Sequence, residues 1–168
     1  MRRAILIAIP VLVLAIVIQT SIASRIMLLS GNADVVLLVV AAWALQERVR
    51  GAWVWCLAAS LLVGISSGVP WYIYLTGYLL AVGLARLLVH RIWQAPLLAM
   101  FAVTLFGTLS VLMLTFLERT LTTVSLALGQ VFSQIVLPTI ILNLLLAIPV
   151  HAVIRDLARW LYPEKETA

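Results

Sequence analysis

Ionisable side chains within apolar stretches are the first candidates for chemistry in this sequence, because burying a charge is costly unless a function requires it. Asp34 stands at the start of an apolar run, where a carboxylate would cap a helix or contact a partner. His90 and His151 stand at the ends of such runs, without the nearby carboxylates or thiols that a metal site needs. The single cysteine, Cys56, is expected to be a small apolar filler. We therefore expect no enzymatic activity, no metal and no cofactor.

The composition determines which elements must hold these residues. Of the 168 residues, 65% are hydrophobic and only 10% are charged, and the mean hydropathy is +1.20. A soluble domain of this size could not bury so much apolar surface, so the solvent must be a lipid bilayer. The apolar stretches are unbroken, which favours an all-α integral membrane protein over a β-barrel. The net charge of +5 comes without a basic cluster and indicates membrane topology, not nucleic-acid binding.

Six apolar stretches predict a single domain that is a bundle of six transmembrane helices. A span needs about 20 mostly apolar residues. The candidates cover residues of about 4–23, 33–46, 51–66, 71–89, 96–117 and 131–153. The short charged tail, 154–168, is expected to continue the last helix along the cytoplasmic surface. The second stretch is short and follows an interruption at 30–34, so it could span the membrane or form a re-entrant loop.

The distribution of positive charges decides between these two topologies, because cytoplasmic loops are enriched in Lys and Arg. If the second stretch crosses, nine basic residues lie inside and two outside; if it does not, three lie inside and eight outside. The second stretch is therefore expected to span, with both termini in the cytoplasm. The outer residues are then Arg25 and Arg119, and the inner ones are Arg2, Arg3, Arg48, Arg50, Arg86, Arg91, Arg155, Arg159 and Lys165.

Polar and aromatic side chains gather toward the outer surface in this topology. Trp71, Tyr74 and Tyr78 share one helical face, and Gln130 and Gln134 lie at the start of the last span, which predicts an outward-facing cavity. An amide midway in the last span cannot be satisfied by lipid, so it is expected to bond to another helix or to contact a partner. The candidate partner-binding residues are Asp34, Trp71, Tyr72, Tyr74, Tyr78, Gln130, Gln134 and Asn143.

Small residues at helical spacing predict close contacts between helices. Ser60, Gly64 and Gly68 repeat every four residues in the third span, and Gly77 does the same with Ala81 in the fourth. Such faces could serve packing within one chain or contact between two copies in a homodimer.

Three groups of residues resemble a known family. Gly31-Asn32-Ala33-Asp34-Val35 opens the short second span, 67–70 forms a small-residue turn, and Pro138, Asn143 and Pro149, followed by Arg155, mark the last span. In their order and spacing they resemble the bacterial rod-shape-determining protein MreD family over nearly the whole chain. One departure is Gly64, where many members carry an aspartate.

The resemblance implies a non-enzymatic part of the bacterial elongation machinery in the cytoplasmic (inner) membrane. Such a protein would bind the single-span scaffold MreC. It would act indirectly on the wall synthase RodA, its penicillin-binding transpeptidase and MreB filaments, and so on peptidoglycan synthesis and cell shape. Size and span number are also similar to those of substrate-binding subunits of energy-coupling-factor transporters, which would be consistent with a shared fold. The outer cavity would then receive membrane-proximal segments of MreC.

Two other interpretations remain open from the sequence. Ala4 and Ala8 have the Ala-x-x-x-Ala spacing with which vitamin-binding subunits of energy-coupling-factor transporters dock their membrane partner. The outer loops, however, offer few hydrogen-bonding groups for a polar vitamin. A membrane scaffold without a cavity is the third interpretation.

Overall fold

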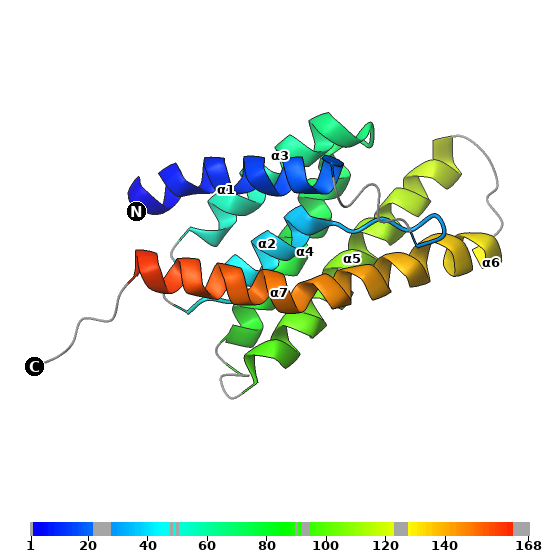
Figure 1. The fold of residues 1–168 in the computed structure, drawn as a ribbon. Helices are drawn as coiled ribbons and strands as arrows, with labels where there is room; N and C mark the ends of the chain where they lie inside the picture. The colour runs from blue at the N-terminus through cyan, green and yellow to red at the C-terminus, as the bar shows by residue number, and fades with distance from the viewer. Residues whose placement is uncertain are drawn as a thin grey trace, which may run out of the picture.

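The computed structural model describes residues 2–21, 28–47, 49, 51–89, 91, 95–122 and 128–162. Expectations for His90, Arg25, Arg48, Arg50 and Lys165 lie outside these residues. Within them every regular element is a helix, which confirms the all-α expectation. The helices are α1 (Arg2–Ser21), α2 (Val35–Ala44), α3 (Ala52–Ser67), α4 (Trp71–Val89), α5 (Pro96–Thr122), α6 (Leu128–Val131), the π-helix η2 (Phe132–Val136) and α7 (Leu137–Leu161) (Figure 1).

Three helices in the described residues are long and apolar enough to cross a membrane, as expected of a membrane protein. They are α4, α5 and the continuous run Gly129–Leu161, which joins α6, η2 and α7. The last helix runs to Leu161, with Pro149 inside it, and so includes the first part of the tail that was expected to continue it. As a result His151 lies well inside α7 and is buried, although it was expected at a helix end.

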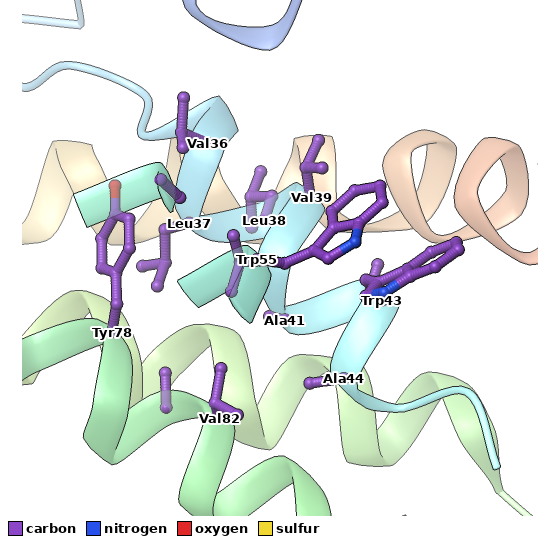
Figure 2. Packing of buried hydrophobic residues seen from close by; sticks show 14 of the residues in the cluster. Val36, Leu37, Leu38, Val39, Ala41, Trp43, Ala44, Trp55, Tyr78 and Val82 are labelled. Atoms are coloured by element: carbon purple, nitrogen blue, oxygen red, sulfur yellow. The ribbon is translucent and has the colours of Figure 1, made fainter. Parts of the chain in front are cut away.

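The centre of the bundle is the short helix α2. Each of its ten residues is buried, because α1, α3, α4, α5 and α7 all pack against it. The surrounding helices contact one another in the order α1, α3, α4, α5, α7, which makes an open ring around α2. Trp43 of α2 stacks on Trp55 of α3 with ring centroids 4.2 Å apart, and both rings are buried (Figure 2). A helix that is apolar all round, like α2, belongs in a core.

Small residues allow the ring helices to approach closely. A Cβ added at Gly77 of α4 would lie 2.5 Å from a methyl carbon of Val111 on α5. A Cβ at Gly64 of α3 would lie 2.7 Å from the main chain of Trp71. Ser60 is fully buried and donates to the Leu57 carbonyl of its own helix. These contacts are made within one chain, which supports intramolecular packing for these three positions.

The turn between α3 and α4 gives Gly68 a different role from the one that helical spacing predicts. Gly68 follows the last residue of α3 and has φ +65°, a left-handed conformation that ends helices and favours glycine. Nothing lies within 4 Å of the position where its Cβ would be. Gly68 therefore ends the helix and is not part of the packing face.

A side chain of α4 holds the segment that follows α2. Arg86 extends its guanidinium group to the main-chain carbonyls of Gln46 and Val49. These carbonyls belong to residues that follow α2, and the Gln46 carbonyl also accepts the N–H of Val49. A cation there also complements the negative end of the helix dipole.

Candidate functional site

Residues 30–34, which precede α2, lie along the last helix. Their main-chain N–H groups donate to it at every second residue, 30, 32 and 34. Backbone N–H groups that are withdrawn from water must find partners within the protein, and these bonds supply them for a segment that is not helical. The three bonds are Ser30 to the Gln134 carbonyl at 3.0 Å, Asn32 to Thr139 Oγ1 at 3.2 Å and Asp34 to Asn143 Oδ1 at 2.8 Å.

Gly31 is the point of closest approach between this segment and α7. A Cβ added there would lie 2.6 Å from the main-chain nitrogen of Thr139 and 2.7 Å from Cβ of Pro138. No real side chain could occupy that space without moving the backbone. Glycine at this position therefore allows the neighbouring N–H groups to reach α7.

The Asp34 carboxylate organises the start of α2. Its Oδ1 accepts the main-chain N–H of Leu37 at 2.9 Å, which is the N-terminal cap expected from the sequence. The hydroxyl of Tyr78, a fully buried residue of α4, donates to the same carboxylate, 2.8 Å from Oδ1 and 2.9 Å from Oδ2. One carboxylate thus joins the cap of the central helix to the middle of α4.

Asn143 connects the same carboxylate residue to two long helices. Its Oδ1 accepts the Asp34 N–H, and its Nδ2 donates to Thr108 Oγ1 of α5 at 2.8 Å. Asn143 is fully buried, and the predicted bond to another helix is confirmed. We call Asp34, Tyr78, Thr108 and Asn143 the Asp34 cluster. Nearby, Gln19 of α1 accepts the N–H of Val36 at 3.1 Å, so α1 joins the network.

The remaining candidate residues lie apart from these bonds. Trp71 and Tyr72 are about half exposed at the start of α4, with their rings edge to face and centroids 6.3 Å apart. Tyr74 is half-buried and contacts Tyr78 edge to face at 5.9 Å. Gln130 and Gln134 are exposed on α6 and η2. The structure therefore brings three of the eight candidates together by hydrogen bonds and a fourth by ring contact.

Sequence reasoning missed the hydrogen-bonding roles of three members of the network, namely Gln19, Thr108 and Thr139. The signal for Gln19 is a single amide near the end of a mostly apolar helix. The two threonines were weaker signals, because a threonine in a membrane helix commonly bonds to its own main chain. Their partners lie 35 and 107 residues away in the sequence, so spacing alone could not pair them.

The hydrogen bonds of this network connect helices to one another, which is a structural role. Its donors and acceptors are paired with one another, and no strong nucleophile lies beside a base. No group of three His, Cys, Asp or Glu side chains in the described part of the chain could hold a metal ion. No protein-family model, curated protein or solved structure matches this chain.

Proposed function

We propose that this chain is a non-enzymatic membrane component of the bacterial elongation machinery that binds an MreC-like single-span scaffold. The proposal rests on how close together certain residues lie in the fold. Residues from two of the three groups that carry the MreD resemblance lie more than 100 residues apart in the sequence, yet they meet in one place. Gly31 contacts Pro138, and the N–H of Asp34 bonds to Asn143. A resemblance made of unconnected chance matches would not be expected to converge in this way.

The second stretch would then cross the membrane as a short non-helical segment followed by a helix. Residues 31–34 add at most ~13 Å to the ~15 Å of the ten residues of α2, together ~28 Å, against ~30 Å of hydrocarbon. This length, with the distribution of positive charges, supports six spans with both termini in the cytoplasm.

The outer surface is the proposed place of partner binding. In this topology, α4 begins there with Trp71 and Tyr72, whose exposed rings are the kind of side chain that anchors interfaces. The Asp34 cluster lies beneath them and would hold α4, α5 and α7 in a fixed relation. We propose that RodA, its transpeptidase and MreB are reached indirectly through the scaffold, as the resemblance implies.

Replacing both Trp71 and Tyr72 with alanine is expected to reduce recovery of the scaffold several-fold in a pull-down from mild detergent. The partner would be identified and quantified by mass spectrometry. Both side chains are exposed, so their truncation should leave the fold intact. Trp160→Ala is the matched control, because this tryptophan is also exposed, at 74%, but lies near the opposite end of the bundle.

Equal scaffold recovery from the double variant and the control would contradict the proposed binding surface. Recovery of paired ATPases, or of a retained vitamin without the scaffold, would instead identify a transporter subunit.

A further inference from the structure

The ring of helices around α2 is open between its two end members, α1 and α7. A groove of about 530 Å³ runs between them, with the beginning of α2 as its floor. Its walls include the exposed Leu14 and Leu145, and its floor includes the buried Ala33 and Val35. Every residue that lines it is apolar.

This groove opens sideways, toward the region that lipid would occupy. The flanking surfaces of both walls are apolar, with Ile9 and Val17 exposed on α1 and Ile148 exposed on α7. An apolar cavity without hydrogen-bonding groups does not hold water. The groove's occupant in a membrane must therefore be hydrocarbon or an apolar protein surface.

The length of the groove distinguishes between these two kinds of occupant. Along α7 the lining extends from Leu142 to Ile154, which is ~18 Å at the rise of an α-helix. One leaflet accounts for half of the hydrocarbon thickness, ~15 Å, so a single acyl chain has a matching length. A transmembrane helix packed along α7 would need about 30 Å of apolar wall, whereas the lining covers little more than one leaflet. The length thus matches a lipid chain in one leaflet and not a spanning helix.

The charges indicate which headgroup would accompany that chain. α1 runs opposite to α7, so the beginning of α1 and the end of α7 lie at the same end of the groove (Figure 1). Arg2 and Arg3 begin α1, and Arg155 and Arg159 lie in the last turns of α7. Asp156 pairs with Arg155 at 3.3 Å and offsets one of these charges. The remaining positive charge at this end favours an anionic lipid.

We propose that the groove between α1 and α7 holds one acyl chain of an anionic phospholipid, with its headgroup at the arginine-rich end. The bound chain would complete the ring around α2, which the helices leave open. This inference requires only that the chain is embedded in a membrane and does not depend on the proposed scaffold partner.

The test uses the purified full-length protein in lipid nanodiscs that contain a phosphatidylglycerol with a photoactivatable group midway along one acyl chain. After irradiation, adducts are mapped by mass spectrometry. We expect several times more adducts per residue on the groove walls than on the exposed Leu87 of α4 and Met113 of α5. The double variant Val11→Phe, Val150→Phe narrows the groove from both walls and should remove this excess.

Val17→Phe is the matched control, since it adds the same side chain to an exposed position of α1 that does not line the groove. Thermal unfolding of each variant establishes that the fold is retained, and Val11→Phe or Val150→Phe alone replaces the double variant if it unfolds. Labelling spread evenly over all apolar faces would overturn the proposal. So would adducts that persist in the narrowed variant, or cross-links at Leu145→Cys to a helix of a second copy or another protein.

Discussion

Replacing Gly31 with alanine is expected to lower the free energy of unfolding by about 3 kcal/mol, as severe overpacking does. The new Cβ would lie 2.6 Å from the main-chain nitrogen of Thr139, which belongs to a helix and cannot move aside. The segment before α2 would therefore have to move away from α7. That shift breaks the bonds that the N–H groups of Ser30 and Asn32 make on either side of Gly31. Equilibrium unfolding in mixed micelles, followed by tryptophan fluorescence, measures the loss.

Gly83→Ala is the matched control for this prediction. Gly83 lies inside α4, and nothing lies within 4 Å of the position where its Cβ would be. Alanine favours a helix interior over glycine by about 1 kcal/mol, so this variant should be slightly more stable than the parent. Similar losses of stability in both variants would mean that the contact of Gly31 with α7 is not what makes Gly31→Ala destabilising.

Local features of the fold could be predicted from the sequence, because they depend on neighbouring residues. The apolar runs predict the helices, and the carboxylate of Asp34 before Val35 predicts the cap of α2. A buried amide such as Asn143 predicts a bond to another helix, because lipid offers none. In each case the residue type and its immediate neighbours are enough to show which kind of contact the residue needs.

The partners of these residues could not be predicted, since they depend on which helices lie side by side. The sequence around 30–34 indicates only an interruption in an apolar run. Its conformation is decided by Thr139 and Asn143, which lie 107 and 109 residues further along the chain from the residues they bond. Without them, the same five residues would be equally compatible with a re-entrant loop.

The π-helical turn at Phe132–Val136 was not predicted from the sequence, for a related reason. Its composition does not differ from that of an ordinary helix, and π-turns are rare. Within it, the carbonyl of Gln134 accepts the N–H of Ser30, from outside the helix. The groove between α1 and α7 was likewise not predicted, because helix order in the bundle does not follow from apolar spacing.

Asp34→Ala is expected to lower the free energy of unfolding by about 3 kcal/mol, from a lost cap and an unsatisfied hydroxyl. The cap of α2 would lose its acceptor for the Leu37 N–H. The larger effect falls on Tyr78, whose hydroxyl would remain in a fully buried side chain without the carboxylate that accepts its hydrogen. Asp34→Asn keeps an oxygen for both donors and should be clearly milder. The same unfolding measurement compares the two variants.

A double-mutant cycle tests whether the buried hydroxyl is the cause. Tyr78→Phe removes the donor, so in the double variant with Asp34→Ala no hydroxyl is left unsatisfied. The double variant should therefore be more stable than the sum of the two single losses predicts, with a coupling energy of about 1–2 kcal/mol. Tyr72→Phe is the matched control, because its ring is half exposed and its effect on stability should add independently to that of Asp34→Ala.

Strict additivity of Asp34→Ala with Tyr78→Phe would mean that the two side chains do not stabilise the bundle as a pair. The cap alone would then account for the role of Asp34, and α4 would be held in place by packing at positions such as Gly77 against Val111.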